Sequence, residues 1–302
     1  MNKADRLNQI LVDKLKNQGF IQSPEIEAAF LSVQRHLFLP NLPLEEVYQD
    51  EAIITKRLNG KSVSSSSQPA MMAIMLEQLN LQPGDQVLEI GAATGYNAAL
   101  MAHIVGAKGQ VITLDIDEDI VKNARRHLEI ATAKQVEVIC ADGGFGYPDF
   151  APYDRIILTV GAWDIAPAWQ QQLKPSGRLV LPLTLIANNE LSIAFDMVEN
   201  NLVSVSSKKC GFIKMRGFFA EPQNNQLIEQ TLTFHLKRQL IKAIVFLGLP
   251  LNMKLRLFSL INFGNSSLEN LHIRVYPPDI DYQPSIRELV VTKYWNKLVL
   301  QW

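Results

Sequence analysis

The stretch that decides the fold is Val87-Leu-Glu-Ile-Gly-Ala-Ala-Thr-Gly-Tyr96. It reads as a short apolar strand, then a loop of small residues between Gly91 and Gly95, then the start of a helix at Tyr96. Small residues let a ligand lie close to the backbone, and the first helical turn offers N–H groups without intrahelical partners. A loop of this kind is also a common tight turn, so its meaning depends on the residues at the ends of the neighbouring strands.

Carboxylates follow the next two predicted strands along the chain. Asp115 ends a strand at residues 110–114, and Asp142 follows a strand at residues 136–140 in the run Ala141-Asp142-Gly143-Gly144. A carboxylate in the first position can accept both hydroxyls of a ribose, and one in the second can accept from an adenine amine. The alternative is that both acids only cap helices. With the glycine loop, they predict a nucleoside cofactor bound at the strand ends.

The glycine loop favours S-adenosylmethionine over a dinucleotide. Dinucleotide sites favour G-x-G-x-x-G before the helix, whereas this loop reads G-A-A-T-G and has Glu89 two residues before its first glycine. S-adenosylmethionine has no pyrophosphate to bind, and it carries a sulfonium and an ammonium that Glu89 can balance. The sequence contains no G-x-x-x-x-G-K-[ST] motif, so an ATP-binding loop is unsupported.

Strands alternating with helices from about residue 69 predict an α/β fold with a mostly parallel sheet. A β-hairpin of residues 191–198 and 202–206 around Glu199-Asn200-Asn201 is expected to make one edge antiparallel. Residues 1–65 are expected to form a helical N-terminal or lid region, 66–217 the cofactor-binding domain, and 218–302 a mixed α and β extension. The parallel strands are expected at 86–90, 110–114, 136–140, 155–160 and 179–185, and the helices at 71–79, 96–105, 117–128 and 166–173.

Composition excludes several other classes of protein. A net charge of -1 over 302 residues argues against a nucleic-acid partner, and Val160-Gly-Ala-Trp163 stands where amino-methylating enzymes commonly carry an Asn/Asp-Pro-Pro-aromatic box. The start of the chain has no apolar signal-peptide core, and residues 240–261 are too interrupted by charges to span a membrane. We therefore expect a cytoplasmic protein; the oligomeric state stays open.

Neither the cysteines nor the histidines predict a metal site. The five histidines are scattered, and Cys140 and Cys210 lie outside any CxxC pattern. Cys140 falls in an apolar alternation and is expected to be a buried small hydrophobe.

Residues 1 to about 217 resemble the protein-L-isoaspartate O-methyltransferase family. The resemblance implies a doubly wound, seven-stranded, Rossmann-like methyltransferase fold with S-adenosylmethionine at the strand ends, and it implies Ser67 as the hydroxyl beside the reacting carboxylate. The implied cofactor contacts are Glu89, Gly91, Ala92, Gly95, Tyr96, Asn97, Asp115, Ile116, Asp142 and Gly143. The matching stretches are Val33-Gln-Arg-His-Leu-Phe-Leu-Pro40, Val47-Tyr-Gln-Asp50, Ser67-Gln-Pro69, Met72-Ala-Ile-Met-Leu-Glu77, Gly95-Tyr-Asn-Ala-Ala-Leu100, Ala141-Asp-Gly143, Ala151-Pro-Tyr-Asp-Arg155 and Leu173-Lys-Pro-Ser-Gly-Arg-Leu-Val180.

The chain departs from the family pattern near its serine. Ala93 replaces a usual glycine, and Ser67 is followed by Gln68-Pro69-Ala70, where the family has a small residue, proline and histidine. Ser-Ser-Gln-Pro variants with a long tail resemble relatives in the maturation of ribosomally made peptides such as lanthipeptides, which methylate a defined aspartate whose ester cyclises to a succinimide. The resemblance therefore implies a precursor peptide as substrate. A general isoaspartyl repair methyltransferase and a non-catalytic S-adenosylmethionine-binding scaffold are the alternatives.

The chemistry needs alignment of the reactants and no general base, because a carboxylate with a pKa of about 4 is already ionised at neutral pH. Ser67 is expected to hydrogen-bond that carboxylate; its alternative role is to cap the helix at 71–79. Trp163 and Trp169 can line a substrate groove or pack in the core. Further candidate substrate contacts are Ser66, Gln68, Lys214 and Arg216, the last two for acidic groups unless they are ordinary surface charges.

Overall fold

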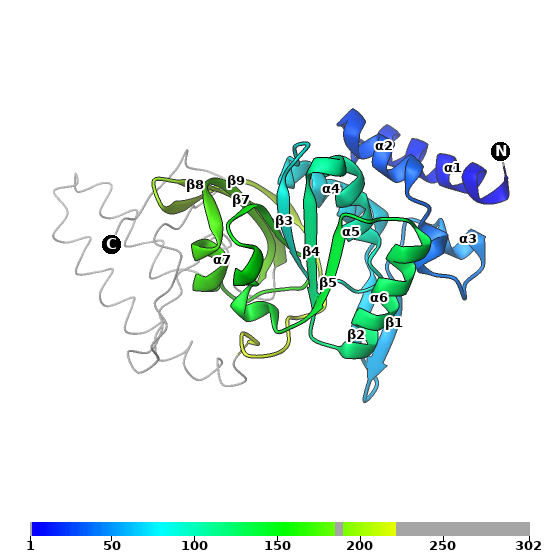
Figure 1. Cartoon of the computed structure of the whole chain (residues 1–302). Helices are drawn as coiled ribbons and strands as arrows, with labels where there is room; N and C mark the ends of the chain where they lie inside the picture. Colours follow the sequence, from blue (N-terminus) through cyan, green and yellow to red (C-terminus); the bar gives the residue numbers. More distant parts are fainter. Residues whose placement is uncertain (1, 185–189, 222–302) are drawn as a thin grey trace, which may run out of the picture. The chain divides into compact units, whose positions relative to one another are not determined.

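The computed structural model describes residues 2–184 and 190–221 of the chain (Figure 1). The chain divides into two units, Met1–Glu221 and Pro222–Trp302. The predicted α and β extension lies outside the described residues except for residues 218–221. The predicted boundaries at residues 65 and 217 stay predictions.

A seven-stranded sheet with the order β5-β4-β3-β6-β7-β8-β9 forms the centre of the first unit (Figure 1). The first five strands in this order pair in parallel, and the last two pair antiparallel. This confirms the predicted doubly wound sheet with its antiparallel edge hairpin. The strands are β3 Gln86–Ile90, β4 Gln110–Asp115, β5 Val136–Cys140, β6 Tyr153–Leu158, β7 Leu173–Thr184, β8 Glu190–Val198 and β9 Asn201–Lys209.

The strand order reverses at β3, whose neighbours are β4 on one side and β6 on the other. In open α/β sheets, ligands bind outside the carboxyl ends of the strands at such a switch point. The loop after β3, which begins at Gly91, is therefore at the position where the fold favours a ligand.

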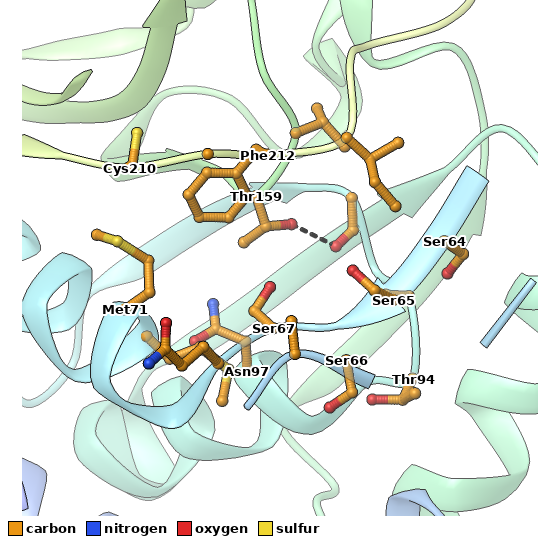
Figure 2. A pocket seen from close by; sticks show the side chains of 18 of the residues that line it. Ser64, Ser65, Ser66, Ser67, Met71, Thr94, Asn97, Thr159, Cys210 and Phe212 are labelled. Carbon is orange, nitrogen blue, oxygen red and sulfur yellow. Dashed lines mark hydrogen bonds between the residues drawn. The ribbon is translucent and has the colours of Figure 1, made fainter. Parts of the chain in front are cut away.

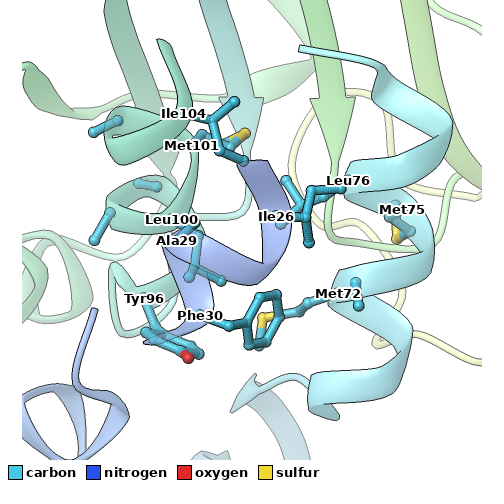
Figure 3. Close-up of a cluster of buried hydrophobic side chains, with 14 of the residues drawn as sticks. Ile26, Ala29, Phe30, Met72, Met75, Leu76, Tyr96, Leu100, Met101 and Ile104 are labelled. Atoms are coloured by element: carbon cyan, nitrogen blue, oxygen red, sulfur yellow. The ribbon is translucent and has the colours of Figure 1, made fainter. Parts of the chain in front are cut away.

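Helices pack against the sheet and against one another through a continuous apolar core (Figure 3). Phe30 and Tyr96 meet edge to face at 6.3 Å between ring centroids, and this contact joins α2 to α5. The described helices are α1 Lys3–Asn17, α2 Pro24–Ser32, α3 Leu44–Val47, α4 Pro69–Leu79, α5 Tyr96–Val105, α6 Glu118–Ile130 and α7 Pro167–Gln171, with 3₁₀ turns η1 Arg35–Phe38, η2 Gly106–Lys108, η3 Gly143–Phe145 and η4 Pro148–Phe150.

A separate two-stranded hairpin precedes α4, at the end of the N-terminal region that the sequence predicted to be helical. Its strands are β1 Ile53–Leu58 and β2 Lys61–Ser66, joined by Asn59-Gly60 at φ 50° and 77°. An Asn-Gly pair is the sequence signal for this type of turn. The hairpin and the residue after it carry the serine run, Ser64-Ser65-Ser66-Ser67, toward the glycine loop.

The expectation that Cys140 is buried is wrong. Cys140 ends β5 and is exposed. Since β5 is the first strand in the order, it lies at an edge of the sheet, and only Val138 among its residues is buried. An apolar alternation on an edge strand therefore does not require burial.

Candidate active site

The loop between β3 and α5 is held tightly against the end of β6. Gly91, Ala93 and Gly95 have φ angles of 109°, 45° and 88°. An added Cβ at Gly91 would lie 2.5 Å from Thr159 Oγ1. The N–H groups of Gly91 and Ala92 both donate to the carbonyl of Leu114, at 2.8 Å. The backbone path therefore requires glycine at residue 91, and Ala93 adopts a left-handed conformation that costs an L-residue about 1–2 kcal/mol.

Glu89 is fully buried beneath this loop, with 0% of its surface exposed. Its carboxylate accepts from Asn97 Nδ2 at 2.7 Å and from Thr113 Oγ1 at 2.6 Å. Burial raises the pKa of Glu89 to about 7, against the opposing effect of these two hydrogen bonds. A nearby cation would favour the ionised form.

Asp115 supports the loop from the neighbouring strand. Its carboxylate accepts from the N–H of Ala93 at 3.1 Å and from that of Asp117 at 3.2 Å, and burial raises its pKa. Asp117 is the N-cap residue of α6, but its side chain makes no capping hydrogen bond. It pairs instead with Lys56 Nζ at 3.0 Å and Arg216 Nη2 at 2.7 Å. Arg216, a predicted substrate contact, is therefore engaged within the chain.

Asp142 is also engaged by the chain itself. Oδ1 accepts from the N–H of Gly144 at 2.9 Å, which caps the turn η3, and Oδ2 accepts from the N–H of Phe218 at 2.6 Å. An added Cβ at Gly217 would lie 2.3 Å from Oδ2, so the chain passes directly over this carboxylate. Each carboxylate oxygen has two lone pairs, which leaves acceptor capacity for a ligand.

The two tryptophans after β6 pack within the protein. Trp169 is fully buried and donates to the carbonyl of Gly143 at 2.8 Å, and Trp163 donates to the carbonyl of Phe219 at 3.0 Å. Core packing therefore accounts for Trp169, and neither residue lines the cavity beside the glycine loop.

This cavity, of about 860 Å³, joins the glycine loop to the serine run (Figure 2). Among the predicted residues, it is lined by Gly91, Ala92, Tyr96, Asn97, Ser66, Ser67, Gln68 and Lys214. The structure thus brings Ser67 and the loop together. The predicted residues that do not line this cavity are Glu89, Gly95, Asp115, Ile116, Asp142, Gly143 and Arg216.

The backbone around Ser67 is fixed by two residues that sequence reasoning did not single out. Asp50 Oδ1 accepts from the N–H of Ala70 at 2.8 Å, whereas the N-cap residue of α4 is Gln68, with no side-chain capping bond. The fully buried Arg35 donates to the carbonyls of Val47, Gln49, Glu51 and Ser67 at 2.9–3.1 Å. The Ser67 hydroxyl is not used as the helix cap, and it lies at the cavity (Figure 2).

Within residues 2–184 and 190–221, no group of three or more His, Cys, Asp or Glu side chains could hold a metal ion. In the same part of the chain, none of the helices has the length and apolar character needed to cross a membrane.

Comparison with known proteins identifies the family. The family model for protein-L-isoaspartate(D-aspartate) O-methyltransferase matches residues 5–217. The chain belongs to this family. It is therefore an S-adenosylmethionine-dependent methyltransferase, as the sequence predicted.

Relatives and solved structures agree with this assignment. The protein-L-isoaspartate O-methyltransferase of Thermotoga maritima is 34% identical over 238 residues, covering 78% of this chain and 74% of that protein. That of Methanopyrus kandleri is 36% identical over 222 residues, covering 72% and 96%. A solved protein-L-isoaspartate O-methyltransferase has a TM-score of 0.66 at 34% identity, covering 75% of this chain and 70% of that one.

A more distant structure shares the fold. The Plasmodium falciparum protein-L-isoaspartate O-methyltransferase, solved with S-adenosyl-L-homocysteine, has a TM-score of 0.61 at 18% identity, covering 72% of this chain and 99% of that one. At this identity the likeness concerns the fold, and it confirms the seven-stranded methyltransferase architecture.

The residues that line the cavity between the glycine loop and the serine run fit the family's cofactor. Ser66 Oγ, Tyr96 Oη and Asn97 Oδ1 are buried polar atoms that lack a hydrogen-bond partner in the described part of the chain, and all three residues line the cavity. Buried polar atoms without partners indicate a missing ligand or water. When bound, S-adenosylmethionine supplies an electrophilic methyl group. Asn97 would offer its free carbonyl oxygen to the ammonium, with the Glu89 carboxylate one hydrogen bond behind it.

The cavity lining combines apolar side chains with a hydroxyl donor. A substrate carboxylate is already ionised, so no residue has to remove a proton from it. Met71, Phe212 and Ile54 give the cavity an apolar lining, and Ser67 offers a hydroxyl donor. Alignment of this kind supplies up to about 7–11 kcal/mol in the best intramolecular models.

Proposed function

We propose that the chain methylates the carboxylate of an isoaspartyl residue in a peptide or protein. The observation that carries the proposal is that the Ser67 hydroxyl and the glycine loop line one cavity. The relatives from Thermotoga maritima and Methanopyrus kandleri are protein-L-isoaspartate O-methyltransferases, which favours this substrate over the precursor peptide expected from the sequence. Ser67 donates to the reacting oxygen and fixes its direction.

On this proposal the strand-end acids bind the nucleoside. Asp115 accepts from the ribose hydroxyls, and Asp142 with Gly143 binds the adenine edge through the acceptor capacity that the chain leaves free. Ile116 is 38% exposed beside Asp115 and offers an apolar surface to the base. Glu89 and Asn97 bind the amino-acid end.

The test is Ser67→Ala, assayed with an isoaspartyl peptide and S-adenosylmethionine. Turnover should fall about ten- to hundredfold, because a hydrogen bond to a charged group contributes about 1.5–3 kcal/mol. Affinity for S-adenosyl-L-homocysteine should stay the same. Ser207→Ala, an exposed serine on β9, is the matched control. Equal losses of turnover and cofactor affinity in Ser67→Ala would contradict the role of the hydroxyl.

A finer version of the proposal makes the substrate an aspartyl residue of a ribosomally made precursor peptide. Two features favour it: Ala70 stands where the family has histidine, and the chain continues to residue 302 beyond the matched residues 5–217. Mass spectrometry should then show a one-methyl gain, lost in mild base, on a cognate precursor and not on a generic isoaspartyl peptide. The reverse result would establish general isoaspartyl methylation. Cofactor binding without methylation of either peptide would favour the scaffold alternative.

A further inference from the structure

A charged pair that the reaction does not use lines the same cavity as Ser67. Glu190 is the first residue of β8, and its side chain is 6% exposed. Its Oε2 accepts from the N–H of Phe212 at 2.7 Å, and its Oε1 lies 3.2 Å from Lys214 Nζ. Lys214 Nζ also donates to Thr184 Oγ1 at 2.7 Å, while the Lys214 side chain is 49% exposed. The carboxylate is thus buried, whereas the lysine side chain is half exposed in the cavity lining.

The backbone of Lys214 is fixed at the carboxyl end of β6. The N–H of Gly161 donates to the carbonyl of Ile213 at 2.8 Å, and the N–H of Met215 donates to the carbonyl of Gly161 at 2.9 Å. An added Cβ at Gly161 would lie 2.2 Å from Glu190 Oε1, so the carboxylate lies directly against this residue. Lys214 therefore has a defined position on the cavity wall, unlike a freely moving surface lysine.

The charges of the cavity wall favour an anionic ligand. Its lining includes two ammonium groups, those of Lys209 and Lys214, and one carboxylate, that of Glu190. Glu190 is buried and already accepts two hydrogen bonds. An ammonium has three donors, and Lys214 uses two of them on Glu190 and Thr184. Within residues 2–184 and 190–221 no partner takes the third donor, so this donor and the exposed Lys209 remain for a ligand.

We propose that Lys214, with Lys209, binds a second carboxylate of the substrate, on a residue flanking the one that is methylated. The inference rests on the proposed function, because it takes Ser67 as the place of the reacting carboxylate. Glu190 and Thr184 orient the lysine, and Glu190 also neutralises it when no acidic group is bound. The enzyme therefore prefers isoaspartyl sites in acidic sequence.

The experiment compares two pairs of amidated isoaspartyl peptides. The two peptides of a pair differ only in having Glu or Gln at one position, which lies before the isoaspartyl residue in one pair and after it in the other. For one side, kcat/KM should be about fivefold higher for the Glu peptide, as for an ion pair worth about 1 kcal/mol at a partly exposed site. The difference should lie in KM, because the contact is made equally before and during methyl transfer. It should shrink as salt is raised.

Variants separate charge recognition from structural support. Lys214→Met should bring the ratio of kcat/KM for the Glu peptide to that for the Gln peptide to about one, whereas Lys214→Arg should keep the parental ratio. Glu190→Gln should raise the ratio, because the lysine loses its competing carboxylate. The Glu190→Gln/Lys214→Met double variant avoids an unpaired buried charge and should also show no preference. Lys122→Met, an exposed lysine on α6, is the control and should leave the ratio unchanged.

Two results would overturn the inference. One is equal kcat/KM for Glu and Gln peptides at low salt in the parent enzyme; the other is a parental ratio in Lys214→Met. If no isoaspartyl peptide is methylated at all, the proposed function fails, and this inference fails with it.

Discussion

Replacing Glu89 with glutamine tests how much unfolding free energy the protein loses by burying an ionisable carboxyl group, because the hydrogen bonds of the side chain are kept. The side chain is fully buried and accepts from Asn97 Nδ2 at 2.7 Å and Thr113 Oγ1 at 2.6 Å. Glutamine keeps the shape and both contacts, because its carbonyl can accept from Asn97 and its amide can donate to the Thr113 hydroxyl. Glu89→Gln therefore removes the ionisable proton and little else.

The size of the effect follows from the pKa. Burial raises the pKa of Glu89 from 4.5 to about 7. Between these values the folded protein holds more protons than the unfolded chain, so the group's contribution to stability falls as pH rises. The difference corresponds to about 3 kcal/mol of unfolding free energy, present below the unfolded pKa and lost above the folded one. We expect the unfolding free energy of Glu89→Gln, relative to that of the parent, to increase by up to this amount as pH rises from about 5 to about 8.

The assay is denaturant unfolding of both proteins, without cofactor, at several pH values across this range. Asp115 is present in both proteins, so the effect of its own burial on its pKa cancels in the difference, whereas its repulsion of Glu89 is part of what is measured. Glu118→Gln, at an exposed glutamate on α6, is the matched control for loss of one carboxylate. A constant difference between Glu89→Gln and the parent at every pH would refute the reasoning. The same variant should bind S-adenosylmethionine more weakly at about pH 8, because no ionised carboxylate remains behind Asn97.

Two further substitutions test the supports of the site. Gly91→Ala should lower the unfolding free energy by about 1–3 kcal/mol and weaken cofactor binding, because residue 91 has a φ of 109° and the added Cβ meets Thr159 Oγ1; calorimetric binding at the parental affinity would contradict this. Arg35→Lys should cost about 3–5 kcal/mol in denaturant unfolding, since an ammonium has three donors and cannot serve all four carbonyls that the buried guanidinium joins. Turnover should fall more than cofactor affinity, because the contact that fixes the backbone of Ser67 is weakened. Parental stability in Arg35→Lys would show that the guanidinium is not needed.

The interior parallel strands could be predicted from the sequence because they are buried on both faces. β3 is buried at four of its five residues, of which three are apolar and one is Glu89, and its predicted bounds agree with the structure. The hairpin of β8 and β9 was signalled by Glu199-Asn200, both of which adopt positive φ. Strong burial and turn residues of this kind leave local traces in the sequence.

The hairpin of β1 and β2 left a weaker trace. It forms a two-stranded sheet outside the main one, and β1 has no fully buried residue. Without a buried face there is no apolar alternation to detect, and only Asn59-Gly60 marked the turn. Because this hairpin brings Ser66 and Ser67 to the cavity, the part of the site with the weakest sequence signal is the part that, on the proposed function, meets the substrate.

Partners of the site residues could not be predicted, because they come from distant segments. Arg216 meets Asp117 across 99 residues of sequence, and Phe218 meets Asp142 across 76. Motif spacing identifies a carboxylate at a strand end, but whether another part of the chain engages it depends on the tertiary path. For the same reason the sequence did not show that Lys214 faces a cavity while Arg216 does not.

The strand order itself gives the three strand-end acids different properties. β3 is central, and its Glu89 is fully buried; β4 is next, and its Asp115 is partly buried; β5 is the edge strand, followed by the partly exposed Asp142. Burial raises the pKa of both Glu89 and Asp115. On the proposed assignment, the deepest carboxylate serves the cationic end of the cofactor, where a charge restores its ionised form, and the outer ones serve the neutral nucleoside by hydrogen bonding. Carboxylate side chains can thus serve either a cation or a neutral nucleoside, because the position of each acid in the sheet sets how much water it retains.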